Sequence, residues 1–513
     1  MKNILLFGLL LALFTTTYGQ KTERDGNYHF KSENYSVALD IYQSLYKADT
    51  ANININYRLG VCYLNCNSNP KAALTHLEFI SASKESDPIY YFELGKAYLY
   101  NYKFANATES FTKSKNLSAK NPEFSHLSTL WLSMTENAKK LTREPLDVSF
   151  INLGKYINSK MDELTPVISA DGENLFYTSN RKFDRSYNLY TYDIFYSEIS
   201  YNAFKKGKAF TAANTMDDEL IAGISATGDR VFVQLQGYDA FEDIAECTRR
   251  GKGFDKKNLL LGQVNSKSAE SGAALSLTGD TLFFSSNREG GKGGFDIYYS
   301  KRLPTGEWGI PINLSDKINT AYDEDFPHMS VDGRTLYFCS NGPNSMGGFD
   351  VFKTILQANG EFSEPINLGF PLNDVFDNKT VAFSANQRYA YVSAIRSDGF
   401  GYSDVYRVIF NQQDPSVKLF IVKMKTGTKE NNAEFAATDT TLAVTAFKKG
   451  KIVFGKYAYD ANSSQSTIAL PPGNYILEIS GKTTETKSMK ITVEDVPGKD
   501  KIIKETVFLE PKK

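Results

Sequence analysis

The glycine-rich stretch SSNREGGKGGFDIYYS, residues 285–300, is the most conspicuous candidate for binding chemistry in this sequence. Glycines around a lysine can form a phosphate loop, in which backbone N–H groups at the start of a helix face the anion. That loop requires the pattern G-x-x-x-x-G-K-[ST]. In this stretch the lysine stands between glycines and a strand-like run follows, so we interpret the glycines as turn residues. No phosphate or other cofactor is expected.

Histidines, serines and cysteines offer no catalytic constellation either. The four histidines are far apart along the chain, at His29, His76, His126 and His328. The phrase GISATG at 223–228 departs from the G-x-S-x-G nucleophile pattern. Cys62 and Cys66 lack the second cysteine pair or nearby histidine of a zinc site, and a local disulfide and two buried thiols both fit their spacing. We expect neither a metal site nor an enzyme.

The stretch 285–300 is one copy of a longer repeat. In each copy a serine ends a short strand, an aromatic-rich strand follows, and a loop then ends in an aspartate. The serines are Ser169, Ser225, Ser276, Ser330 and Ser384, and the aspartates are Asp193, Asp243, Asp296, Asp350 and Asp404. Four short strands per copy predict an all-β propeller over residues 146–411, with five blades, or six if a degenerate copy is hidden.

The recurring aspartate has a structural interpretation. A short carboxylate at the end of a loop can accept backbone N–H groups and fix the strand that follows. Arg181, Arg288 and Arg396 stand at the end of the preceding strand and are expected to pair with this aspartate. A metal site is the weaker alternative, because carboxylates spread around a ring would not converge on one ion.

A second acidic position is the stronger candidate for function. Six residues before the serine, four of the repeats have a glutamate, at Glu163, Glu219, Glu270 and Glu324, and the fifth has Asn378. An aspartate directly precedes several of these positions, at Asp162, Asp218, Asp323 and Asp377. If the strands that follow are innermost, these acids ring one mouth of a central channel. Such a ring could hold a cation or a basic segment of a partner. Local hydrogen bonds within the loops are the alternative.

The x-S-x-D-G and S-N-R elements of these repeats resemble known bacterial propeller repeats. They are similar to repeats related to WD repeats, of the type in the periplasmic propeller of the Tol system.

Residues 20–143 are predicted to be helical and to carry a repeat of their own. LGVCY at 59–63 recurs as LGKAY at 94–98, and Gly26 precedes Gly60 by 34 positions. A small and then a large residue follow each glycine, which lets antiparallel helices approach closely. The period and the positions Gly60, Tyr63, Gly95, Tyr98 and Ala107 resemble the tetratricopeptide repeat (TPR). The resemblance implies a concave groove for a peptide or protein, with a structural spacer as the alternative.

Residues 415–513 return to strand-sized runs separated by Gly, Asn, Pro and Lys-rich turns. Their alternation predicts a small two-sheet β-sandwich. The phrase LPPGNYILEI resembles the carboxypeptidase-regulatory-like family.

The N-terminus and the overall charge indicate an exported protein that does not bind nucleic acid. Residues 1–19 have the positive start, short apolar run and small-residue end of a signal peptide. No later segment predicts a transmembrane helix. Basic and acidic residues number 58 and 59, for a net charge of −1, which gives no attraction for a polyanion.

This order of regions resembles a group of Bacteroidetes envelope proteins that includes outer-membrane-associated components of type IX secretion and gliding. Those proteins commonly continue into an OmpA-like domain, which is not found here, nor is a lipobox cysteine, so contact with the cell wall is left open. The resemblance implies a non-catalytic scaffold in the periplasm or at the outer membrane, or on the cell surface. Its partners would be outer-membrane or periplasmic proteins. A carbohydrate- or peptidoglycan-binding propeller is the alternative.

Overall fold

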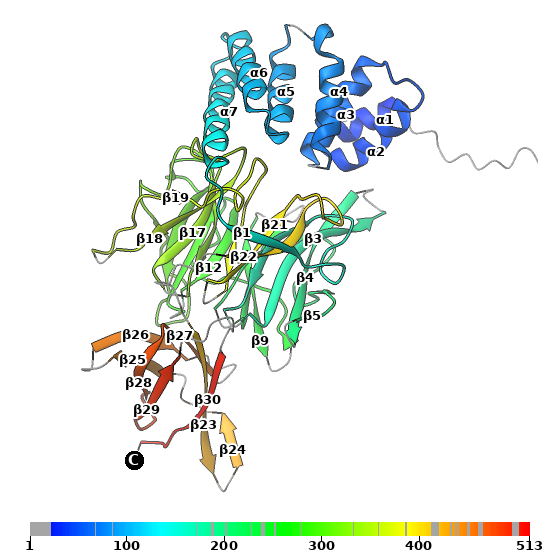
Figure 1. Ribbon diagram of the computed structural model, residues 1–513. Coiled ribbons are helices and arrows are strands. Elements are labelled where there is room, and N and C mark those ends of the chain that lie inside the picture. The colour runs from blue at the N-terminus through cyan, green and yellow to red at the C-terminus, as the bar shows by residue number, and fades with distance from the viewer. Residues whose placement is uncertain are drawn as a thin grey trace, which may run out of the picture. The chain divides into compact units, whose positions relative to one another are not determined.

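The computed structural model contains helices followed by antiparallel sheets, which confirms the predicted order of structural classes (Figure 1). The chain divides into two compact units, Met1–Lys120 and Asn121–Lys513. The signal peptide predicted at 1–19 lies outside the described residues. These are 22–512 without 67, 85, 171, 186–188, 201–202, 227, 237–241, 251–252, 277–278, 332, 358, 385–386, 412–419, 431–432, 437–438, 440, 449–451, 460–464 and 495–501.

The N-terminal unit is a series of helices in which each packs on the next. Two of them, α4 and α5, begin with an Asn or Asp cap followed by proline, whose missing N–H costs nothing in the first turn. The helices are α1 (Glu23–Lys31), α2 (Tyr35–Tyr46), α3 (Ile53–Asn65), α4 (Pro70–Phe79), α5 (Pro88–Tyr100) and α6 (Phe104–Leu117), with a 3-10 turn at Ser81–Ser83. The C-terminal unit begins with α7 (Pro122–Leu141).

Helix pairs approach closely at the glycines that the sequence pattern singled out. A Cβ atom on Gly60 would lie 2.6 Å from Cγ of Leu77, and one on Gly95 would lie 2.7 Å from the ring of Phe111. Ala107 is fully buried beside them. These contacts fix the spacing of α3 against α4 and of α5 against α6.

Five antiparallel sheets follow α7. Sheets one to four each consist of consecutive strands. Sheet one contains β2 (Glu163–Ile168), β3 (Asn174–Asp184), β4 (Leu189–Ser200), β5 (Ala203–Phe204) and β6 (Lys208–Ala209), and sheet two contains β7 (Asp218–Ile224), β8 (Arg230–Gln236), β9 (Ile244–Arg250), β10 (Gly253–Phe254) and β11 (Asn258–Leu259). Sheet three contains β12 (Glu270–Leu275), β13 (Thr281–Ser286), β14 (Asp296–Lys301) and β15 (Ile312–Asn313), and sheet four contains β16 (Glu324–Met329), β17 (Thr335–Ser340), β18 (Asp350–Ile355) and β19 (Ile366–Asn367).

Sheet five joins the two ends of this region. It contains β20 (Ala382–Phe383), β21 (Tyr389–Ala394) and β22 (Asp404–Phe410), and its fourth strand is β1 (Val148–Asn152) (Figure 1). The pairing runs antiparallel from Val148 opposite Phe410 to Asn152 opposite Tyr406. The first strand of the region therefore completes the last sheet.

The hydrophobic core of this region lies between the sheets. Separate clusters of buried side chains bridge sheets one and two, two and three, three and four, four and five, and five and one. Strands such as β13 are therefore buried on both faces, which explains their continuous apolar and aromatic sequences. The five sheets form a closed circuit.

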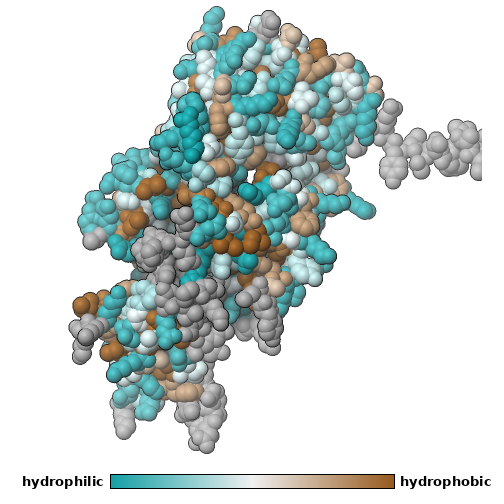
Figure 2. All heavy atoms as spheres, in the orientation of Figure 1, coloured by the Kyte–Doolittle hydropathy of each residue, from teal (hydrophilic) through white to brown (hydrophobic). Residues whose placement is uncertain are grey.

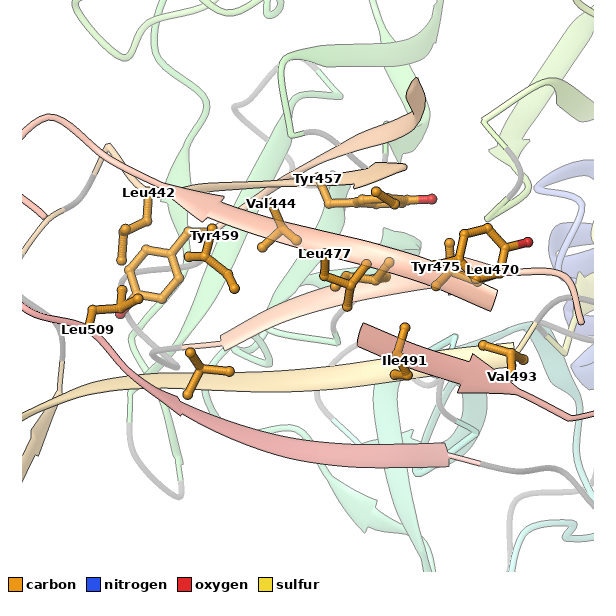
Figure 3. Close-up of a cluster of buried hydrophobic side chains, with 14 residues drawn as sticks. Leu442, Val444, Tyr457, Tyr459, Leu470, Tyr475, Leu477, Ile491, Val493 and Leu509 are labelled. Atoms are coloured by element: carbon orange, nitrogen blue, oxygen red, sulfur yellow. The ribbon is translucent and has the colours of Figure 1, made fainter. Parts of the chain in front are cut away.

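The last region has two four-stranded sheets around one hydrophobic cluster. One sheet contains β23 (Phe420–Glu430), β24 (Ala433–Ala436), β27 (Gln465–Leu470) and β30 (Ile502–Phe508), and the other β25 (Ala443–Lys448), β26 (Ile452–Ala458), β28 (Gly473–Ser480) and β29 (Lys487–Val493). Figure 3 shows side chains of both sheets, including Val444, Leu477 and Leu470, in this cluster.

Within the described ranges, none of the helices combines the length and apolar character that crossing a lipid bilayer requires.

Candidate functional site

The repeated glutamates lie at or near the start of the first strand of their sheets, where they are buried. Glu163, Glu219, Glu270 and Glu324 are at most 1 % exposed. In sheet three, Glu270 accepts hydrogen bonds from the backbone N–H of Ser266 (2.9 Å), the Ser266 hydroxyl (2.6 Å) and the Ser286 hydroxyl (2.8 Å). Equivalent bonds from a serine or threonine four residues earlier reach the other three glutamates.

Three of the four glutamates also have a cation beside them. Nη2 of Arg181 lies 2.9 Å from Glu163, and Nη2 of Arg288 lies 3.0 Å from Glu270. Nζ of Lys257 lies 2.5 Å from Glu219. A buried carboxylate is costly unless a positive charge and hydrogen bonds compensate it, and here both are present.

The expected pairing of the strand-end arginines with the repeated aspartates is wrong. Arg181 and Arg288 pair with the buried glutamates instead, while Arg396 lies 4.0 Å from the centre of the Phe150 ring. In sheet three the reason is that Asp296 already accepts backbone and amide donors, whereas the buried glutamate needs a countercharge. In sheet one, Lys182 lies beside Asp193 instead.

Glu324 in sheet four differs from the others. Its bonds from Thr320 and Ser340 are present, but Gly342 stands where sheets one and three have arginine. Among the described residues, no lysine or arginine forms an ion pair with Glu324. Burial raises the pKa of the Glu324 carboxyl to about 7.

Sheet five keeps the arrangement with its residue types exchanged. Asp374 stands in the place of the serine or threonine, and Asn378 stands in the place of the glutamate. The Asn378 side chain accepts the backbone N–H of Asp374 (2.7 Å) and donates to the Asp374 carboxylate (3.4 Å). The hydrogen bond between the two positions is therefore retained, although the carboxylate now belongs to the earlier residue, Asp374, rather than to the later one.

The acids that precede these positions connect neighbouring sheets. Asp323 of sheet four accepts the backbone N–H of Phe295 in sheet three (2.9 Å), and Asp377 accepts that of Phe349 (3.0 Å). The series closes where Asp162 of sheet one accepts the backbone N–H of Ser403 in sheet five (3.1 Å). Asp218 makes the same link to Tyr192.

The repeated aspartates at the loop ends bind their own loops. Asp296 accepts the backbone N–H groups of Lys292 (2.6 Å) and Gly293 (3.2 Å) and the side-chain amide of Asn313 (3.0 Å). Asp350 and Asp404 have corresponding partners. Asp193 instead lies 3.7 Å from Nζ of Lys182, and Asp243 directly precedes β9.

A set of asparagines that the sequence reasoning missed completes the links between sheets. In sheet four, Asn319 accepts the backbone N–H of Ile297 (2.8 Å) and donates to its carbonyl (2.9 Å). Asn158, Asn214, Asn265 and Asn373 do the same with the residue after the loop aspartate of the preceding sheet. Each of these asparagines stands eleven residues before the repeated serine that ends the first strand of its sheet, and this constant spacing could have revealed them.

Small cavities lie between the first strands of the sheets. Two of them have volumes of about 20 Å³, and His328 borders both. Burial lowers the pKa of His328 to about 4, which keeps the ring neutral. The proposed acidic ring at a channel mouth stays a prediction, and the bonds described above hold each glutamate within the loops and strands around it. Among the described residues, no group of three or more His, Cys, Asp or Glu side chains is arranged to hold a metal ion.

The residues singled out in the helical region are packing residues. The Tyr63 hydroxyl accepts the side-chain amide of Gln43 (3.0 Å), and the Tyr63 ring stacks on His76 at 5.8 Å. Tyr98 is half-buried, and burial raises its pKa to about 12. Cys62 is a free, buried thiol, and burial raises its pKa well above its usual range.

Comparison with known proteins gives structural similarities but no family. No protein-family model and no curated protein matches the chain. The type III secretion translocator chaperone SycD of Yersinia enterocolitica is 25 % identical, covering 23 % of this chain and 81 % of its own, with a TM-score of 0.20. TolB of Acinetobacter baumannii is 12 % identical over 57 % and 71 % of the two chains, with a TM-score of 0.32. An endo-arabinase of Bacteroides thetaiotaomicron is 12 % identical over 52 % and 99 %, with a TM-score of 0.35. TM-scores of this size do not establish a shared function.

Proposed function

We propose that sheets one to five are the blades of a five-bladed β-propeller. The support is the closed circuit of bridging clusters, the asparagine and aspartate links, and the completion of sheet five by β1. We further propose that the helices form a TPR-like array and that the last two sheets form a carboxypeptidase-regulatory-like sandwich around their common core.

The function we propose is that of a non-catalytic protein-binding scaffold of the cell envelope. The acids, serines and arginines that recur in the sheets are engaged in bonds within and between sheets, so their repetition serves architecture. Arrays of helical repeats, in contrast, present extended surfaces to partner proteins. The proposed partners are outer-membrane or periplasmic proteins of a secretion, gliding or assembly complex.

The observation that carries this proposal is a set of exposed apolar side chains on the helical array. Ile53 begins α3, Phe79 ends α4 and Ile89 lies in the first turn of α5, and they are 44 %, 57 % and 52 % exposed. Because successive helices run antiparallel, these residues stand at the same end of their helices (Figure 1). Figure 2 shows hydrophobic residues among hydrophilic ones on the visible surface. Apolar side chains grouped in this way are typical of a protein-binding surface.

The test is affinity capture of the tagged full-length protein from native envelope. We expect a stoichiometric outer-membrane or periplasmic protein to be retained, and a variant with Ile53, Phe79 and Ile89 changed to serine to lose it. Ile310→Ser, at a position 72 % exposed in the segment between β14 and β15, is the matched control and should retain the partner. Retention on isolated cell wall without a protein partner would favour the peptidoglycan-binding alternative.

A further inference from the structure

The loop before Asp350 in sheet four has lost the positive charges of its counterpart in sheet three. The sequence SNREGGKGGFD at 286–296 becomes SNGPNSMGGFD at 340–350. Gly342 replaces Arg288, and Met346 replaces Lys292. Met346 is fully buried, whereas Lys292 reaches outward to Asp316, with 2.9 Å between Nζ and the carboxylate. The glutamate beneath the loop is nevertheless retained as Glu324.

Helix α7 contacts this same neutral loop. The side-chain amide of Asn137 donates hydrogen bonds to the backbone carbonyls of Pro343 and Ser345. The imidazole of His126 stacks on the ring of Tyr322, with 6.3 Å between the ring centres and 12° between the planes. Both contacts lie within the C-terminal unit.

Gly342 lies beside Tyr322 and is connected to Glu324 through Ser340. A Cβ atom at Gly342 would be in contact with the Tyr322 ring, at 3.4 Å. The Ser340 hydroxyl accepts the backbone N–H of Gly342 (3.2 Å) and donates to Glu324 (2.8 Å). Among the described residues, sheet four therefore combines a contact with α7 and a buried acid that forms no ion pair.

Acidic residues surround Glu324, and burial raises the pKa of Asp325 and of Asp350 as well. The nearby cation is Lys379, which lowers the pKa of Asp325. Asp323 and Asp325 flank it in the chain, Asp296 of β14 raises its pKa, and Asp350 of β18 lies in the same cross-strand row through Ser340. From α7 the titratable group on this side is His126, which is separated from Glu324 by Tyr322. A carboxylate formed here would be repelled by its neighbours and could gain solvation only if the covering loop moved.

We propose that the protonation state of Glu324 controls the attachment of α7 to sheet four. While the carboxyl keeps its proton, the 341–346 loop stays closed and presents the carbonyls of Pro343 and Ser345 to Asn137. Loss of that proton to solvent leaves a buried carboxylate, which draws water under the loop and withdraws the two carbonyls. Helix α7 is therefore attached to sheet four when Glu324 is protonated and is released when Glu324 is ionised.

Hydrogen–deuterium exchange of the full chain between pH 5.5 and 8.5, corrected for intrinsic exchange rates, tests this coupling. In the unmodified chain we expect protection of residues 122–141 and 341–349 to fall about tenfold as the pH rises, the change that one pKa unit of coupling produces. Glu324→Gln should hold the protected state throughout. Glu270→Gln, at the arginine-paired position, should leave the pH dependence of α7 in place.

A second variant separates charge from packing. Gly342→Arg supplies the missing cation to Glu324, so the pH dependence of the protection of α7 should become smaller. Protection of α7 that does not change with pH in the unmodified chain would overturn the proposal. So would an unaltered pH dependence in Glu324→Gln.

Discussion

Glu270 and Glu324 occupy equivalent places in sheets three and four but differ in their surroundings. Both are fully buried and accept the same loop and strand donors, yet only Glu270 has an arginine within 3.0 Å. Burial raises the pKa of Glu324, whereas Glu270 has the guanidinium of Arg288 beside it. Substitution by glutamine, which resembles a protonated carboxyl, should have opposite effects at the two positions.

For Glu324, stability should decrease as the pH rises. Its pKa is about 7 in the folded state against 4.5 for an ordinary glutamate, so the folded chain binds more protons between these values. The free energy of unfolding then falls with pH by up to about 3 kcal/mol across that window. Glu324→Gln should remove this slope and raise the melting temperature at pH 8, measured by calorimetry.

For Glu270, the same substitution should destabilise the chain at pH 8. It leaves the guanidinium of Arg288 half-buried without a countercharge, a change that typically costs about 3 to 5 kcal/mol. The melting temperature at pH 8 should therefore drop in Glu270→Gln. Equal shifts in the same direction for both variants would contradict the assignment of their charge states.

The asparagine links should be worth more than a surface hydrogen bond. Asn319→Ala leaves the backbone N–H and carbonyl of Ile297 buried without partners, which should lower the free energy of unfolding by about 2 to 4 kcal/mol. Asn319→Asp keeps the acceptor and loses the donor, so chemical denaturation should place it between alanine and the unmodified chain. A cost no greater for alanine than for aspartate would show that the link is not stabilising.

At the scale of elements, the sequence was informative where a repeat imposed regular spacing. The aromatic strands, the loop aspartates and the small-to-large helix contacts follow from periodicity, because each repeat must bury the same faces against its neighbours. The partners of the arginines could not be predicted from the sequence. Arg181 is closer in the sequence to Asp193 than to Glu163, and the pairing of β2 with β3 is what brings Glu163 next to Arg181. The use of β1 to complete sheet five depends on closure of the whole circuit and has no local signal.

The helix contacts make a prediction at this scale. Gly60→Ala places a Cβ atom 2.6 Å from Leu77, which should destabilise the helical unit by about 1 to 3 kcal/mol despite the better helix propensity of alanine. Circular dichroism during denaturation can follow this loss. In a Leu77→Ala background the cost of Gly60→Ala should shrink, because the clashing side chain is gone. An unchanged cost would exclude the clash as its cause.

At the scale of the whole molecule, both units contain repeats that cannot bury their faces alone. In the C-terminal unit five sheets close on themselves, and their polar residues link one sheet to the next. In the N-terminal unit the helices form a series whose ends carry exposed apolar side chains. Binding of a partner protein is the function that we propose for this surface.

Cross-linking in intact envelope, followed by identification of the bound protein, tests most directly whether the helical unit binds a partner protein. We expect one stoichiometric outer-membrane or periplasmic partner whose cross-links map to α3–α5. Changing Ile53, Phe79 and Ile89 to serine should remove these cross-links, and Ile310→Ser should leave them in place. A partner that persists in the triple variant, or binding to purified cell wall alone, would show that this surface does not bind the partner.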